Sequence, residues 1–488
     1  MKVRVKSILQ NFFKYACGII FVSSCLSQRL VHRMSAQLKY RIARIRRFLK
    51  HKSHQTWRLS QKSLELSCLL TGALLVALVS WGFATLVELG FEINTFLVNQ
   101  NTWVAWLLLP LGMAILAWFT KTYTPYVAGS GIPQVIASIK LPHGNTKEIL
   151  VEITQTIWKI PLTFLAMCCG ASVGREGPSV QVGAAVMLAW GKFCRKHNLA
   201  FKNLSYNELI ATGAAGGLAA AFNAPLAGVI FAIEELGRGT ALRWERRVLL
   251  GVLAAGFMLV LIQGNNPYFS HYQGAGSVSN IVGWILLCAL VTGILGGLFA
   301  RLLAKGLAAY APGATRGFIR RHPILIAFLL GIVLAALGTF SNHQTYGTGY
   351  TVVTSALQGE HLDPSLGITK LLATVFTYWT GIAGGIFTPA LTTGAALGSS
   401  IWELTGGLVD QRFLVLLSMA AFLAAATQTP VTASVVVMEM TNSQQELVWL
   451  LSTCLIASVV SRQFCPKPFY HLMAGRFRQT IQELQQKE

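Results

Sequence analysis

Residues 173–181, Val-Gly-Arg-Glu-Gly-Pro-Ser-Val-Gln, set an arginine and a carboxylate between two long apolar runs. An ionised side chain at membrane depth is costly, so it normally lines a wet cavity or has a partner and marks a functional site. Glu176 is therefore a candidate functional group, because its carboxylate can carry charge and bind a proton. The alternative is a structural carboxylate at a membrane surface, paired with Arg175.

The residues around Glu176 predict the start of an interrupted helix. Pro178 suits the first turn of a helix, and Gly174 and Gly177 permit a break in the backbone before it. A helix N-terminus presents unpaired N–H groups and the positive end of the helix dipole. This segment is therefore expected to offer an anion site.

Glu234 and Glu235 end an apolar segment and form the second candidate group. Carboxylates at such a place often only reach water, so a proton-carrying role competes with a structural one. Adjacent residues on a helix point about 100° apart, so only one of the pair should face a route to Glu176. Lys159, in an otherwise uncharged stretch, is expected to be a buried counter-charge, with a snorkelling lysine as the alternative.

The elements that position these groups must lie in a membrane. The chain has 488 residues, of which 53% are hydrophobic and only 12% charged, which excludes an ordinary soluble protein. Five segments without acidic or basic residues are 22 to 32 residues long, enough to cross a bilayer, namely 66–87, 93–120, 209–233, 371–402 and 413–438. The longer runs 248–300 and 322–359 must each hold more than one helix. The 45 glycines favour close helix packing and broken helices.

The positive charge is concentrated at the N-terminus, where residues 1–62 contain 15 Lys and Arg and no Asp or Glu. We expect a basic cytoplasmic arm over 1–62, a transmembrane domain over 63–480 and a short tail over 481–488. A signal peptide is not favoured, because no cleavage pattern is clear. The arm is either a mobile solvated tail or an amphipathic helix on an anionic leaflet, since apolar residues recur at spacings of 3 and 4: Leu30, Met34, Leu38, Ile42, Ile45 and Leu49.

The body contains an internal repeat. Residues 218–234 align without gaps on residues 423–439, and Pro178 with its following Gly183-Ala-Ala matches Pro389 with Gly394-Ala-Ala. The two halves are therefore expected at about 63–270 and 271–480. Paired halves with Gly/Pro-interrupted apolar segments are typical of transporters whose substrate site lies where broken helices meet.

Three breaks carry a family resemblance: 129–133 (Gly-Ser-Gly-Ile-Pro), 174–178 (Gly-Arg-Glu-Gly-Pro) and 384–389 (Gly-Gly-Ile-Phe-Thr-Pro). In this order they resemble the ClC family of chloride channels and chloride/proton antiporters. Residues 223–228 leading into Glu234-Glu235, and 467–470, also look like ClC segments, so the resemblance covers roughly 65–475. It implies an all-α polytopic membrane protein with an inverted repeat and broken, re-entrant helices.

The resemblance also implies residue roles. Ser130 and Tyr470 would give hydroxyls to a central anion, and backbone N–H groups around Gly177, Ile386 and Phe387 would complete its shell. A desolvated chloride needs several donors without a full positive charge, which agrees with this set.

By the same resemblance, Glu176 would be the gating carboxylate and Glu235 the internal proton acceptor. ClC channels typically lack a carboxylate at the second position, which favours a chloride/proton antiporter over a voltage-gated or passive chloride channel. An intramembrane enzyme has no motif to support it.

The family further implies a homodimer with one pore in each subunit, in a bacterial inner membrane, with both termini cytoplasmic. Its substrates would be chloride and protons, and we expect no metal, cofactor or nucleic acid. Ser130 favours chloride over nitrate or fluoride. Gln134 and Ala383 depart from the commonest exchanger pattern, which bears on rate and gating. With about eighteen residues after Tyr470, the chain resembles bacterial forms without C-terminal regulatory domains, of the ClcB type.

Overall fold

A computed structural model describes residues 36–141, 148–201, 204–240, 242, 246–269, 272 and 280–485. The chain divides into two compact units, Met1–Leu66 and Ser67–Glu488. In the first unit the described part, residues 36–66, is the beginning of helix α2 (Ala36–Gln100). The predicted apolar stripe of the arm lies outside the described residues, since Leu30 and Met34 precede them and the side chains of Leu38, Ile42, Ile45 and Leu49 are not described.

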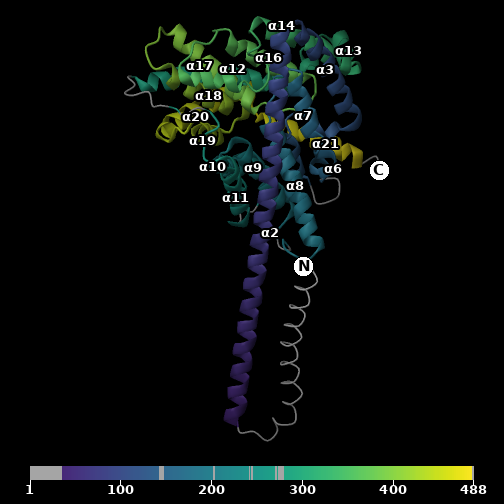
Figure 1. Ribbon diagram of the computed structural model, residues 1–488, viewed down its shortest axis with the longest axis vertical. Helices are drawn as coiled ribbons and strands as arrows, with labels where there is room; N and C mark the ends of the chain where they lie inside the picture. The colour runs from purple at the N-terminus through teal and green to yellow at the C-terminus, as the bar shows by residue number, and fades with distance from the viewer. Residues whose placement is uncertain are drawn as a thin grey trace. The chain divides into compact units, whose positions relative to one another are not determined.

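The second unit is built from helices (Figure 1), so the predicted all-α membrane fold is confirmed. Six of the described helices are long and apolar enough to cross a membrane: residues 63–100 of α2, α3, α11, α12, α14 and, with the turn before it, α20. After α2 the helices are α3 (Trp103–Tyr123), α4 (Ile132–Lys140), α6 (Ile153–Thr156), α7 (Lys159–Cys168), α8 (Glu176–Lys196), α9 (Tyr206–Phe222), α10 (Pro225–Phe231), α11 (Arg246–Gln263), α12 (Ile281–Lys305), α13 (Gly313–Arg321), α14 (Pro323–Phe340), α15 (Tyr350–Gln358), α16 (Leu366–Trp379), α17 (Phe387–Leu404), α18 (Gln411–Thr427), α19 (Pro430–Thr441), α20 (Leu447–Phe464) and α21 (Phe469–Gln485).

Some charge-free runs hold a helix break that hydropathy does not mark. The run 93–120 contains the end of α2 and most of α3, because Asn101 accepts a hydrogen bond from the Trp103 N–H at 3.0 Å and starts a new helix. The run 209–233 contains α9 and α10, separated at Asn223, which is left-handed with φ of 52°. Apolar composition thus identified membrane segments but not single helices.

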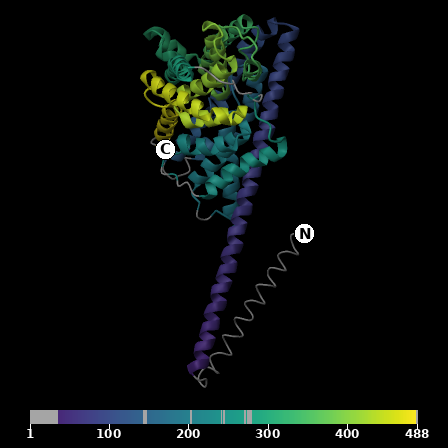
Figure 2. The same cartoon turned by 90° about the vertical axis from the view of Figure 1, so that its left-hand side faces the viewer.

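The repeat is visible in the order of the elements. In the first half α8 packs on α9, and α10 follows; in the second half α17 packs on α18, and α19 follows. α9 and α18 both end in a left-handed residue, Asn223 or Gln428, and Pro225 or Pro430 then starts the next helix. Helices α10 and α19 are in contact, so the halves meet at corresponding elements (Figures 1 and 2).

Two carboxylates stabilise the contact between α10 and α19, because each one caps the helix that belongs to the other half. Glu439 of α19 accepts hydrogen bonds from the N–H groups of Leu226 and Ala227 at the start of α10, at 3.1 and 2.7 Å. Its repeat partner Glu234 accepts from the N–H groups of Val431 and Thr432 at the start of α19, at 3.2 and 2.6 Å. The first N–H groups of a helix have no intrahelical partner. Each half of the repeat therefore supplies the acceptor that these N–H groups need in the other half.

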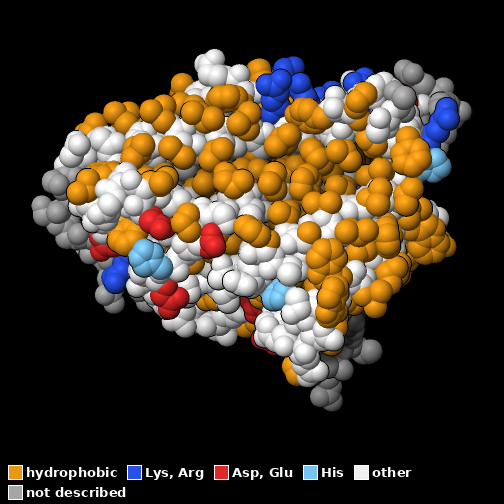
Figure 3. Space-filling model, turned by 90° about the horizontal axis from the view of Figure 1, so that it is seen from above, with side chains coloured by type: hydrophobic (Ala, Val, Ile, Leu, Met, Phe, Trp, Pro, Cys, Tyr) orange, Lys and Arg blue, Asp and Glu red, His pale blue; other side chains and the backbone are white. Residues whose placement is uncertain are grey.

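Small residues allow the helix pairs to approach closely. A Cβ atom added to Gly183 of α8 would lie 2.4 Å from the carbonyl oxygen of Gly213 in α9, and one added to Gly394 of α17 would lie 2.5 Å from that of Ser418 in α18. Large apolar side chains instead remain exposed on the outside, among them Leu107, Leu261 and Val459. Figure 3 shows hydrophobic side chains over much of one face, which suits contact with lipid.

Candidate functional site

The three Gly/Pro-marked breaks meet in space and bind one another through their backbones. Gly129 donates to the Ile382 carbonyl at 2.9 Å and accepts from the Gly384 N–H at 3.1 Å. Gly174 and Gly385 exchange two hydrogen bonds, at 2.7 and 2.8 Å. A break in a buried helix frees backbone groups that must find partners, and here each break supplies them to another. The resulting cluster is where the candidate residues converge.

Glycine is required where the first two breaks touch. A Cβ atom on Gly177 would lie 2.2 Å from Ser130 Oγ and 2.6 Å from the Ser130 carbonyl oxygen. Gly131 has φ of 105°, a conformation that side chains disfavour. These two glycines let the N-terminus of α8 lie directly against Ser130.

The five predicted anion-binding residues are all buried near this contact. Ser130 and Tyr470 are each 1% exposed, and their hydroxyls have no hydrogen-bond partner by geometry among the described residues, although Tyr470 is close enough to Ser130 to interact. Ile386 and Phe387 cap and start α17, directly after Gly385, whose Cβ would lie 3.1 Å from the Gly177 nitrogen. Hydroxyls and helix N-termini thus face one region, as an anion shell requires.

Glu176 is the first residue of α8 and is completely buried. Its carboxylate crosses to the N-terminus of α17, where it accepts from the Thr388 hydroxyl and, at 3.4 Å, from the Thr388 N–H. Gly174 makes room for it, since a Cβ there would lie 2.3 Å from Glu176 Oε2. Sequence reasoning missed Thr388, although its place between Phe387 and Pro389 at the third break was a usable signal.

Arg175 points away from Glu176 and has a different acidic partner. Its Nη1 lies 2.6 Å from Glu88 Oε1 and 3.0 Å from the Ala84 carbonyl oxygen, and its guanidinium lies 5.3 Å from the ring centre of Tyr268. The structural alternative for Glu176, a surface carboxylate paired with Arg175, is therefore wrong. Because Arg175 is paired with Glu88, the Glu176 carboxylate binds Thr388 at the start of α17 instead.

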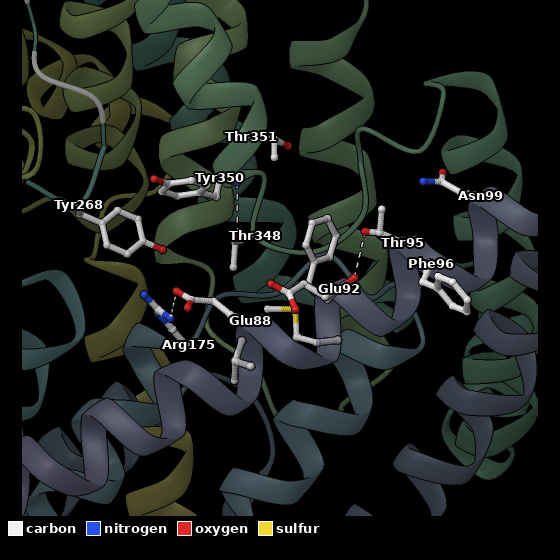
Figure 4. Close-up of a pocket in the computed structure, with 13 residues that line it drawn as sticks. Glu88, Glu92, Thr95, Phe96, Asn99, Arg175, Tyr268, Thr348, Tyr350 and Thr351 are labelled. Carbon is white, nitrogen blue, oxygen red and sulfur yellow. Dashed lines mark hydrogen bonds and ion pairs between the residues drawn. The ribbon is translucent and has the colours of Figure 1, made fainter. Parts of the chain in front are cut away.

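A cavity of about 670 Å³ lies against Arg175. Figure 4 shows Glu88 and Arg175 joined at its edge, with Tyr268 and Tyr350 facing them and Glu92 further along α2. Glu88 is 63% exposed in its side chain whereas Arg175 is 6% exposed, so the pair connects the cavity to the buried cluster. The cavity therefore lies beside Arg175, the residue that precedes Glu176 in the chain.

Glu235 lies on the π-helical turn Ala232–Leu236 that continues α10. It is 1% exposed, and neither carboxylate oxygen has a hydrogen-bond partner within the described part of the chain. Glu234 points the other way, to the start of α19. Tyr470 is within electrostatic reach of both Glu235 and Glu176.

Two buried polar side chains support the segment that carries Ser130. Lys159 donates to the Val127 carbonyl at 2.9 Å and to Gln181 Oε1 at 2.8 Å. Lys159 is completely buried, so it does not snorkel, and these bonds go to neutral oxygens rather than to the opposite charge that we expected. Gln134 donates to the Ala128 carbonyl at 2.6 Å, a bond that an ionised glutamate at this position could not make.

Comparisons with known proteins place these features in context. The profile described as "Voltage gated chloride channel" matches residues 111–462. The chain is 29% identical over 413 residues to an H(+)/Cl(−) exchange transporter ClcA of Cronobacter sakazakii, covering 78% of this chain and 82% of that one. It is 28% identical over 392 residues to the ClcA transporter of Vibrio parahaemolyticus, covering 77% and 80%.

Solved structures share the fold. A slow cyanobacterial Cl−/H+ antiporter superposes with a TM-score of 0.71 at 26% identity, covering 85% of this chain and 98% of that one. A CLC-type fluoride/proton antiporter superposes with a TM-score of 0.67 at 22% identity, covering 84% and 98%.

Proposed function

The chain belongs to the voltage-gated chloride channel family, and on this premise we propose that it exchanges chloride for protons across a membrane. The names of the ClcA relatives and of the cyanobacterial antiporter support exchange. The observation that carries the proposal is the pair of buried carboxylates, Glu176 at the N-terminus of α17 and Glu235 on the turn that continues α10. A passive channel does not need the second one.

Chloride binds between the broken helices. The hydroxyls of Ser130 and Tyr470 and the N–H groups of Gly177, Ile386 and Phe387 replace its hydration shell. These donors are dipoles rather than full charges, so the anion is stabilised without being held too tightly to leave. The buried Lys159 donates to a backbone oxygen and an amide oxygen instead.

Glu176 is the gate. Ionised, its carboxylate takes the place of an anion at the N-terminus of α17 and competes with chloride there. Protonation makes it neutral, which weakens its attraction to the helix end and lets it leave toward the cavity at Arg175. Chloride then enters the place that the carboxylate has left, so anion movement and proton movement are linked.

Glu235 supplies the other end of the proton route. It receives protons from the internal side and passes them toward Glu176, past Tyr470. Glu234 has no part in this route, because its carboxylate caps α19.

The protein works as a homodimer in a bacterial inner membrane, with one pore in each subunit and both termini in the cytoplasm. The dense positive charge of residues 1–62, next to the first span, favours this orientation.

Reconstitution in liposomes tests the proposal. With a chloride gradient imposed and the membrane potential clamped, chloride and proton movements are followed together with a chloride electrode and a pH electrode. Exchange predicts uphill proton movement driven by chloride. If chloride gradients collapse with no accompanying proton movement, the protein is a passive channel and the exchange proposal is wrong.

A further inference from the structure

Three titratable side chains form a row that ends at Glu235. His471 Nε2 lies 3.5 Å from Glu235 Oε1, and His471 Nδ1 lies 2.8 Å from Lys140 Nζ. Glu235 is 1% exposed in its side chain and His471 11%, and Lys140 is partly exposed. The row therefore leads from accessible surface to a buried carboxylate that has no hydrogen-bond partner among the described residues.

The row is assembled by the same helices that form the anion shell. Lys140 is the last residue of α4, which follows Ser130, and His471 follows Tyr470 in α21. The helices α4 and α21 pack on each other. Three other charged groups act on this row electrostatically. Glu234 does so although its carboxylate points to α19, and the other two are Arg238, just after the turn that carries Glu235, and Arg478 of α21.

The contact with Lys140 fixes which nitrogen of the imidazole carries hydrogen. A lysine ammonium has only donors, so it donates to Nδ1. A neutral imidazole then carries its hydrogen on Nε2, the nitrogen that faces Glu235. The geometry therefore presents a donor to an otherwise unpartnered carboxylate.

We propose that His471, oriented by Lys140, delivers protons from the internal side to Glu235. This inference rests on the proposed exchange function. In the transfer the N–H bond at Nε2 breaks and an O–H bond forms on Glu235, while Lys140 gives a proton to Nδ1. The imidazole stays neutral, the ammonium becomes an amine, and the carboxylate becomes a carboxylic acid. Internal water returns a proton to Lys140, and proton exchange of the ring with water restores its first tautomer.

The first test is His471→Gln, because glutamine keeps polarity and approximate size but cannot relay a proton. We expect chloride transport to be retained and proton transport to fall by roughly 100-fold or more, the scale on which a positioned acid or base acts. His322→Gln, at an exposed position between α13 and α14, is the matched control and should keep the wild-type ratio of protons to chloride. An unchanged ratio in His471→Gln would overturn the proposal.

Chemical rescue separates proton delivery from a structural role of His471. Imidazole inside vesicles containing His471→Ala should restore chloride-driven proton transport, because a free imidazole can occupy the vacated space. It should not restore transport in Glu235→Gln, which lacks the acceptor. Imidazole that raised proton transport equally in both variants would be carrying protons outside this route, and failure to rescue His471→Ala would contradict delivery by the ring.

The role of Lys140 is tested by removing the proton that it gives to Nδ1. Lys140→Met has no proton to give, so proton transport should fall as in His471→Gln while chloride transport is retained. Lys140→Arg keeps the positive charge, but a guanidinium is not deprotonated in proteins, so proton transport should fall in this variant too. A wild-type ratio of protons to chloride in Lys140→Met would show that Lys140 does not act on His471.

The outcomes separate this inference from the proposed function. If wild type moves no protons, or Glu235→Gln still does, the exchange mechanism itself fails. If wild type and Glu235→Gln behave as proposed and His471→Gln keeps the wild-type ratio, only the delivery through His471 fails.

Discussion

At the scale of single residues, the two buried carboxylates differ in what holds them. Glu176 accepts from the hydroxyl and N–H of Thr388 at a helix N-terminus, an environment that stabilises the ionised form. Glu235 is buried without such donors and faces an imidazole. One group is therefore suited to compete with anions and the other to take up protons.

Replacing Glu176 by glutamine mimics the protonated form of the proposed gate. We expect Glu176→Gln to keep anion flux, lose proton coupling and become nearly independent of pH, since an amide does not titrate. Liposome flux measured across a range of pH checks this. Uphill proton pumping by the variant in response to a chloride gradient would show that Glu176 is not the gate.

The Thr388 hydroxyl should set how firmly the ionised gate is held. A hydrogen bond to a charged group contributes about 1.5–3 kcal/mol, so Thr388→Val should release the gate and raise chloride turnover at neutral pH while leaving coupling intact. Thr393→Val is the matched control, because that hydroxyl is equally buried in α17 but donates to the Pro389 carbonyl. Identical turnover in the two variants would remove Thr388 from the mechanism.

Glu235 and Glu234 are adjacent but should respond differently to the same change. Glu235→Gln removes the proposed proton acceptor, so we expect retained chloride transport and lost proton transport. Glu234→Gln alters a cap at the start of α19 and should keep both transports at a reduced rate. Chloride and proton fluxes measured together in both variants check this. Loss of proton transport in Glu234→Gln but not in Glu235→Gln would make Glu234 the proton acceptor instead.

At the scale of elements, the repeat does more than duplicate helices. In each half, a helix that begins with proline has first N–H groups with no acceptor inside the helix. A carboxylate from the other half accepts their hydrogen bonds. The three Gly-marked breaks likewise satisfy one another's backbones. Neither half could complete its buried hydrogen bonds alone, so the halves are expected to fold as one unit.

The reciprocal caps can be tested through stability. Glu439→Gln weakens the cap of α10, and loss of a helix cap typically costs about 0.5–2 kcal/mol, so the melting temperature in detergent should fall. Glu403→Gln, an exposed carboxylate near the end of α17, serves as the control. Equal melting temperatures for the two variants would mean that the cap contributes nothing measurable.

At the scale of the whole molecule, the basic arm and the transport machinery are separable in sequence. Every candidate site residue follows residue 128, whereas the excess of positive charge lies in residues 1–62. Attraction between such a segment and anionic lipid is electrostatic and is screened by salt.

Deleting residues 1–55 should therefore leave chloride and proton transport intact in vesicles. Binding of the isolated arm to anionic vesicles should fall as salt is raised, as measured by co-sedimentation. A truncated protein that still forms a dimer but carries no chloride would overturn this division of labour.

The sequence by itself determined that this is a membrane protein, where its helices are broken and that it contains a repeat. It also identified Glu176 and the pair Glu234-Glu235 as candidate functional groups. These follow from local properties, because hydropathy, charge and the backbone preferences of glycine and proline act over a few residues. Glu176 and the break at Gly174 and Gly177 could be singled out in this way, whereas Ser130 could not. The identity of the anion shell came from family resemblance rather than from spacing.

Only the tertiary structure decided which groups meet. Thr388 is 212 positions from the Glu176 that it holds, and Arg175 finds Glu88, 87 positions away, instead of its neighbour. Glu234 caps α19 through Val431 and Thr432, which follow it by 197 and 198 positions. Lys140 contacts His471, which is 331 positions away in the sequence. A sequence pattern reports which face of an element is apolar, but a polar side chain's partner depends on how separate elements pack, which no local period records.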